Sequence, residues 1–143
     1  MTDRGYTVHL TEEAAAEAGL TAEEALDAVC EGTYFFQRVS NTIEWGSQNT
    51  CSPTLPPEYA PQRIDVTLEG TCNDAWCVLW YTEDGPINSG WTYSRVATAT
   101  TSETCDSNDL RRFRIAVHLR YAGGALDYGT VRSAPWYDVD CDV

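Results

Sequence analysis

The chain has 143 residues, 22 of them acidic and nine of them arginine with no lysine, which gives a formal net charge of −13. This length suits one domain with a substantial core, whereas the negative charge argues against nucleic acid as a partner. The sequence has no apolar run long enough for a membrane span and no basic-then-apolar start, so neither a membrane span nor a signal peptide is predicted.

The first 31 residues differ from the rest. Residues 5–10 (GYTVHL) place Tyr6, Val8 and Leu10 on one side, which predicts an edge strand or an arm that pairs with a partner's sheet. Residues 11–19 read as a short helix, and a capping box at Thr21 starts a second one. The acids over residues 12–31 form a solvated face or a docking surface for a basic partner. We expect an N-terminal arm with short acidic helices over residues 1–31 and a β-sandwich domain over residues 32–143.

From residue 32 the sequence follows the period of strands and turns. We expect two strands or one bulged strand over 33–45, a turn at 46–51 and a proline-rich loop at 51–61. A strand at 63–70, an aromatic strand at 77–82 and a turn at 83–86 (EDGP) follow. The rest of the chain is expected to contain strand residues over 88–101, a turn at 106–109, and strands at 111–121, 126–131 and 136–141. Seven or eight short strands predict an all-β fold, a disulfide-stapled, antiparallel, immunoglobulin-like β-sandwich with a short N-terminal helical segment.

The strand over residues 111–121 is expected to be central, because side chains for an inward and an outward face alternate along it without exception. Its inward face is predicted to comprise Phe113, Ile115, Val117, Leu119 and Tyr121. Its outward face is predicted to comprise Arg112, Arg114, Ala116, His118 and Arg120. The three outward arginines either pair with acids on an adjacent strand, such as Asp65 and Glu69, or form a docking patch for an acidic partner. We favour internal pairing.

The six cysteines favour three disulfides over a zinc site, because no Cys-x-x-Cys pair is present and the chain has two histidines. The strand order favours the pairs Cys30–Cys51, Cys72–Cys77 and Cys105–Cys141. Disulfides persist outside the cytosol, so we expect a secreted, extracellular protein whose leader is absent from this sequence. A protein secreted without a leader, or a virion protein that oxidises after release, is the alternative.

No pattern of a catalytic, cofactor or metal site is complete. His118 lies between arginines on the polar face of its strand, and no nucleophile elbow accompanies it. Clustered acids such as Asp106 and Asp109 lack the spacing of a calcium loop. We therefore expect no catalytic residue, no metal and no cofactor, and a small-molecule ligand is not favoured.

The five tryptophans and eight tyrosines are many for a chain of this size. Most are expected in the core, but some near turns, such as Trp76 and Trp91, are candidate anchors for a partner. An acidic helical start before a cysteine-stapled β domain resembles small secreted proteins of high-GC Gram-positive bacteria.

Together these features favour a non-enzymatic protein-binding or assembly module, a subunit of an extracellular multiprotein particle. The candidate partner-binding residues are Tyr6, Val8, Leu10, Trp76, Trp91, Arg112, Arg114 and Arg120. The alternatives are a secreted effector or protease inhibitor that presents the loop between Cys72 and Cys77, and a carbohydrate-binding module.

Overall fold

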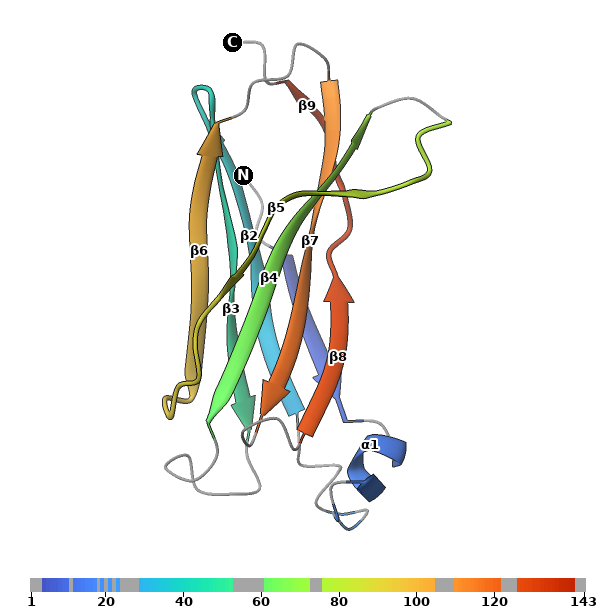
Figure 1. Cartoon of the computed structure of the whole chain (residues 1–143), viewed down its shortest axis with the longest axis vertical. Coiled ribbons are helices and arrows are strands. Elements are labelled where there is room, and N and C mark those ends of the chain that lie inside the picture. The colour runs from blue at the N-terminus through green and yellow to red at the C-terminus, as the bar shows by residue number, and fades with distance from the viewer. Residues whose placement is uncertain are drawn as a thin grey trace.

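The structure, a computed structural model, describes residues 4–10, 12–17, 19, 21, 23, 29–52, 61–72, 76–104, 110–121 and 126–140. This part of the chain is an antiparallel β-sandwich with two sheets (Figure 1). A four-stranded sheet has the order β1-β2-β3-β6, and a five-stranded sheet has the order β5-β4-β7-β8, with β9 also paired to β7. The described residues thus contain nine strands, where the sequence predicted seven or eight.

The four-stranded sheet contains β1 (Arg4–His9), β2 (Val29–Val39), β3 (Thr42–Ser52) and β6 (Val96–Thr104). Strand β1 pairs antiparallel with β2, so the N-terminal arm is an edge strand of its own sheet. Residue 31, the expected boundary between an N-terminal segment and the sandwich, lies inside β2. The first predicted helix is present as α1 (Glu12–Glu17), which precedes Gly19 with a φ of 77°. Most of the second predicted helix lies outside the described residues.

The five-stranded sheet contains β4 (Gln62–Cys72), β5 (Tyr81–Asn88), β7 (Leu110–Tyr121), β8 (Leu126–Arg132) and β9 (Trp136–Asp140). Strand β7 is central, because β4 pairs with it on one side and β8 and β9 pair with it on the other. This confirms the central position expected for the strand over residues 111–121. The strands predicted over residues 63–70, 126–131 and 136–141 correspond to β4, β8 and β9, within one or two residues at most described ends.

The core lies between the sheets, and the alternation of β7 is confirmed. Its inward side chains, Phe113, Ile115, Val117, Leu119 and Tyr121, are at most 4% exposed. From the opposite sheet, Phe36 and Trp45 are fully buried, and the Phe36 ring lies 5.7 Å from that of Phe113. At about 1.5 to 3 kcal/mol for each large apolar side chain, burial of the β7 face favours folding by about 8 to 15 kcal/mol before the loss of chain entropy.

The turn predicted at residues 46–51 is wrong, because these residues continue β3 and pair with β2 up to Ser52. The polar sequence Ser-Gln-Asn over residues 47–49 suggested a turn, but the side chains of Ser47 and Asn49 point inward and are 1% exposed. A buried polar group is tolerated when it is hydrogen-bonded. Ser47 Oγ donates to the Thr33 carbonyl at 2.8 Å, so this hydroxyl meets that condition within the sheet.

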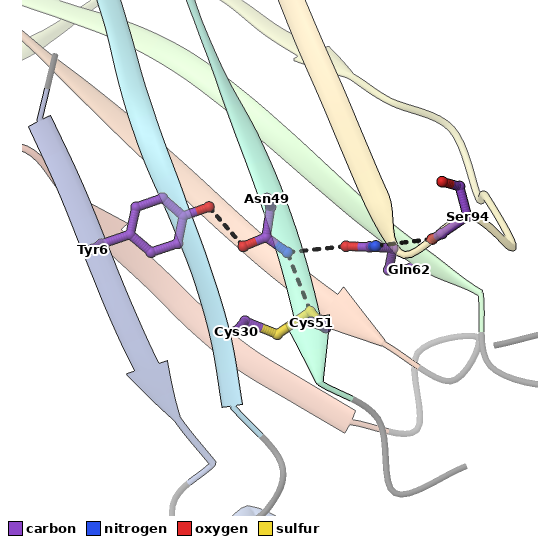
Figure 2. Close-up of a disulfide and its surroundings, with 6 residues drawn as sticks. All are labelled: Tyr6, Cys30, Asn49, Cys51, Gln62 and Ser94. Carbon is purple, nitrogen blue, oxygen red and sulfur yellow. Dashed lines mark hydrogen bonds between the residues drawn. A yellow bond between two sulfur atoms is a disulfide. The ribbon is translucent and has the colours of Figure 1, made fainter. Parts of the chain in front are cut away.

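Asn49 is the centre of a buried polar network that joins both sheets beside the Cys30–Cys51 disulfide (Figure 2). The Tyr6 hydroxyl donates to Asn49 Oδ1 at 2.8 Å, and Asn49 Nδ2 donates to Gln62 Oε1 at 3.0 Å. Gln62 Nε2 donates in turn to the Ser94 carbonyl at 3.0 Å. The network therefore connects β1, β3, β4 and the segment before β6, and it fixes their positions at this end of the sandwich.

The strand predicted at residues 77–82 and the turn at residues 83–86 are both corrected. Residues 77–80 have no regular structure, while β5 begins at Tyr81 and includes the EDGP sequence. The pairing of β5 with β4 shifts register between Val66 and Glu69, as a β-bulge allows. Pro86 is tolerated there because β5 is an edge strand, and an N–H on the outer side of an edge strand has no neighbouring strand to bond.

The strand predicted over residues 88–101 is confirmed only from Val96 onward. Residues 89–95 bend instead and make one isolated bridge, Gln62 to Thr92. Ser and Thr side chains there bond to nearby main-chain groups, including Ser94 Oγ, which accepts from the N–H of Val96 at 3.2 Å. Such local bonds compete with a strand ladder, and this explains the irregular segment.

Two of the predicted disulfides are confirmed. Cys30 and Cys51 lie directly opposite each other on β2 and β3, and Cys72 and Cys77 close a short loop after β4. The third predicted pair, Cys105 with Cys141, lies outside the described residues, as does the predicted turn at 106–109. Disulfides of this kind point to an oxidising, extracellular environment.

Candidate binding surface

The outer face of the five-stranded sheet carries the outward residues of β7 that the sequence singled out. Arg112, Arg114, His118 and Arg120 are partly exposed, whereas Ala116 is only 6% exposed because longer neighbours surround it. Arg63, Asp65, Thr67 and Glu69 of β4 lie on the same face, together with Arg132 of β8. Strand alternation thus gathers five arginines on one face of a strongly acidic chain.

Each carboxylate of β4 on this face is bound by two arginines. Glu69 accepts from Arg114 at 2.6 Å and from Arg132 at 3.1 Å. Asp65 accepts from Arg120 at 2.6 Å and from Arg63 at 2.9 Å. The internal pairing predicted for Arg114 and Arg120 is therefore confirmed. Each arginine–carboxylate cluster therefore contains two arginines and one carboxylate, and its formal charge is +1.

These contacts also affect proton binding. Burial raises the pKa of the Asp65 carboxyl, but hydrogen bonds and charges from Arg63 and Arg120 outweigh burial and hold that pKa below its ordinary value. Asp127 behaves similarly: burial raises its pKa, while the N–H of Gly129 and the hydrogen bond and charge of His118 lower it. His118 Nε2 lies 2.8 Å from Asp127 Oδ1. The carboxyl groups of Asp65 and Asp127 therefore stay ionised to lower pH than usual.

A shallow hollow of about 400 Å³ lies over Ala116 between the two arginine–carboxylate clusters. It is lined by Asp65, Thr67, Glu69, Thr82, Pro86, Ala116, His118, Arg120, Thr130 and Arg132. The two carboxylates that line it on β4 are already occupied by arginine. Within the described ranges, no cluster of three His, Cys, Asp or Glu side chains could hold a metal ion.

A tryptophan ring lies near one arginine of each cluster. The Arg114 guanidinium lies 4.3 Å from the centre of the Trp80 ring, and that of Arg112 lies 5.9 Å from it. At the other cluster, the Arg120 guanidinium lies 5.6 Å from the Trp91 ring. These cation–π contacts hold both the rings and the arginines in place.

Trp80 belongs to an apolar stretch that we call the aromatic segment, residues 76–81, in which four large side chains are exposed. Trp76 is 78% exposed, Val78 74%, Leu79 65% and Tyr81 61%. Soluble proteins seldom expose several large apolar side chains side by side unless the patch binds something. Figure 1 shows this segment, before β5, projecting away from the body of the sandwich.

The aromatic segment is tied to the sheet at its start. The Cys72–Cys77 disulfide joins it to the end of β4. Arg112 donates from Nε to the Cys72 carbonyl at 3.1 Å and from a terminal nitrogen to the Cys77 carbonyl at 2.5 Å. Trp80 completes the attachment through Arg114. The exposed side chains therefore project from an anchored main chain.

The structure separates the predicted partner-binding residues into two groups. Val8 and Leu10 are 8% and 7% exposed and belong to the core, and Tyr6 packs against it and bonds to Asn49. Trp76 and Trp91 are exposed, but Trp76 lies in the aromatic segment and Trp91 lies in the irregular segment between β5 and β6. Arg112, Arg114 and Arg120 share its outer face. Only Trp76, Arg112 and Arg114 of this set meet at the aromatic segment.

Sequence reasoning missed Val78, Leu79 and Tyr81 as surface residues. An apolar run of this length is equally typical of a buried strand, and the sequence was interpreted that way. The one signal in favour of a surface segment is that it begins inside the loop between Cys72 and Cys77 and ends shortly before the EDGP sequence. Arg63 and Arg132 were also missed, because their role depends on strand neighbours.

No protein-family model matches the chain, and no curated protein is detectably similar to it in sequence. Among the described residues, no helix is long and apolar enough to cross a membrane.

Proposed function

We propose that this protein is a secreted, non-enzymatic protein-binding module, and that the aromatic segment is its partner-binding site. The observation that carries the proposal is the exposure of Trp76, Val78, Leu79 and Tyr81 on an anchored segment. Tryptophan and tyrosine are the residues most often found at the energetic centre of protein interfaces. Such a module would serve as an adaptor or structural subunit of an extracellular assembly.

The energetics support this use. Complete burial of the four side chains would yield about 6 to 12 kcal/mol, at about 1.5 to 3 kcal/mol each. Association costs about 4 to 15 kcal/mol in lost freedom, and ordering a loop adds to that cost. The disulfide and Arg112 reduce the second cost, since they hold the main chain before a partner arrives. The anchored arrangement is therefore better suited to binding than a free loop would be.

The fold part of the proposal is that the sandwich is immunoglobulin-like. Consecutive strands β3 and β4 lie in different sheets, as do β6 and β7, while β3 pairs with β6 and β4 with β7. Immunoglobulin domains pair strand B with E and C with F in the same way. In such folds the loops at the ends of the sandwich commonly bind partners, as the aromatic segment would here.

The test compares variants in affinity capture from culture medium of the source cells, with captured proteins identified by mass spectrometry. The double variant Trp76→Ala and Leu79→Ala should lose a specific partner while its melting temperature stays unchanged, because both side chains are exposed. The matched control is Val39→Ala, which removes an exposed apolar side chain, 44% exposed, from the other sheet. Equal recovery of the same partner by all three proteins would refute the proposal.

A protease inhibitor is the second candidate, because Trp76 lies in the loop that the Cys72–Cys77 disulfide closes, as in inhibitors that present a rigid segment to an enzyme. A panel of secreted proteases distinguishes the two functions: inhibition that is lost on reduction of the Cys72–Cys77 bridge supports the inhibitor. Carbohydrate binding is less favoured, since arginines already contact the Trp80 and Trp91 rings on which sugars would stack.

A further inference from the structure

Strand β6 forms one edge of the four-stranded sheet, and this edge differs from the others. Figure 1 shows β3 beside it on one side and no other labelled strand on the opposite side. Its nine residues, VATATTSET, pair with β3 without a register shift from Val96 to Thr104. They include no proline, glycine or basic residue. A long, regular edge of this kind leaves a row of main-chain groups open to pairing with another strand.

The other edges of the sandwich carry features that oppose such pairing. Strand β5 has Glu83, Asp84 and Pro86 and two register shifts. The pairing of β8 with β7 shifts register between Leu119 and Arg120, and residues 133–135 separate β8 from β9. Strand β1 is short, and Arg4 reaches the carbonyls of Ala134 and Pro135 in the other half of the sandwich. Proteins use bulges, charges and short strands in this way to block edge-to-edge contact.

The sequence around β6 is complementary to itself in the antiparallel direction. Arg95 precedes the strand and Glu103 lies near its end, so opposite charges stand at the two ends. When two copies pair with Thr100 facing Thr100, Glu103 of each copy faces Ala97 of the other and lies diagonal to its Arg95. Diagonal cross-strand neighbours are about 7 to 8 Å apart, within reach of long side chains. No like charges face each other in this register.

The side chains of the outer face agree with the same register. Thr98, Thr100, Ser102 and Thr104 are exposed, while Ala97 and Ala99 are buried. Pairing about Thr100 places Thr98 opposite Ser102, which are cross-strand hydroxyl pairs that stabilise sheets. Shifting one strand by a single residue would place inward side chains opposite outward ones. Even shifts keep the faces aligned, but they shorten the paired stretch.

We propose that β6 is a self-association edge: two copies of this chain pair their β6 strands antiparallel about Thr100 and join their four-stranded sheets into one. The arrangement is two-fold symmetric, so it closes at a dimer. It uses a different surface from the aromatic segment and leaves that segment free on both copies. Because each copy carries a net charge of −13, added salt should screen repulsion and favour the dimer.

Cysteine trapping tests the register. Residues directly opposite in an antiparallel pair have Cα atoms about 4.5 or 5.5 Å apart, within the usual range of a disulfide. Thr100→Cys should therefore form a covalent dimer under mild oxidation that a reductant reverses. Ser102→Cys is the matched control, since two copies of residue 102 would be four residues out of register, about 13 Å apart. Equal crosslinking of both variants, or of neither, would overturn the proposal.

Sedimentation velocity tests the pairing without a crosslink. The wild-type protein should dimerise, and Thr100→Lys should raise the dimer dissociation constant by about fivefold or more, because like charges would face each other across the axis. Thr7→Lys is the matched control on the opposite edge, β1, and should leave the constant unchanged. A wild-type protein that stays monomeric at high concentration and moderate salt, or a dimer lost only with Thr7→Lys, would overturn the proposal.

Discussion

Replacing Asn49 with leucine tests how the buried polar network stabilises the sandwich. Asn49 is 1% exposed and bonds both to the Tyr6 hydroxyl and to Gln62 Oε1. The leucine has a similar size but removes these hydrogen bonds, so that two largely buried polar groups, the Tyr6 hydroxyl and Gln62 Oε1, lose their Asn49 partner. Each such group costs about 1 to 3 kcal/mol. With some gain from the added apolar surface, we expect the free energy of unfolding to fall by about 2 to 4 kcal/mol.

The assay is denaturant unfolding followed by tryptophan fluorescence, with thermal melting as a second measure. Thr50→Leu is the control, because Thr50 is the exposed neighbour on β3 and should change stability by less than about 0.5 kcal/mol. Tyr6→Phe in the Asn49→Leu background removes one of the two groups that lost their Asn49 partner, so the double variant should be more stable than the sum of the single effects implies. Strictly additive losses, or no loss with Asn49→Leu, would refute the reasoning.

Three further predictions concern the five-stranded sheet. Val117→Asp places an unpaired charge in the core and should leave little folded protein, whereas Ala116→Asp faces the outer hollow and should be tolerated; equal melting temperatures would contradict the assigned faces. Arg114→Ser with Arg120→Ser should lower the melting temperature by only a few degrees, since partly exposed ion pairs contribute about 1 kcal/mol or less each; an unchanged melting temperature at low salt would argue against a stabilising role. Because the pKa of Asp65 is lowered in the folded protein, its carboxylate stabilises the fold above the unfolded pKa of about 3.9, and this stability is lost as the pH falls below that value. Asp65→Asn should therefore make the free energy of unfolding, measured with urea, fall less steeply at acid pH. An unchanged acid dependence would contradict this.

The sequence alone determined the features that depend on local periodicity. The alternation from Phe113 to Tyr121 specified a two-faced strand, and the same period in β4 specified a second one, because successive side chains of a strand point to opposite faces. The pairs Cys30–Cys51 and Cys72–Cys77 followed from strand order and short separation. That outward arginines of the central strand pair with Asp65 and Glu69 was also predicted from the sequence, whereas the register that joins Arg114 to Glu69 and Arg120 to Asp65 came from the structure.

Only the tertiary structure decided which polar residues are buried and which apolar residues are exposed. Ser47 and Asn49 are inside because Thr33, Tyr6 and Gln62, distant in sequence, satisfy their hydrogen bonds, and no local pattern encodes those partners. The apolar run of residues 76–81 is outside because the Cys72–Cys77 bridge and Arg112 hold it beyond the end of β4. Burial is a property of the assembled sheets, so one apolar run becomes core and another becomes surface according to what the fold places over it.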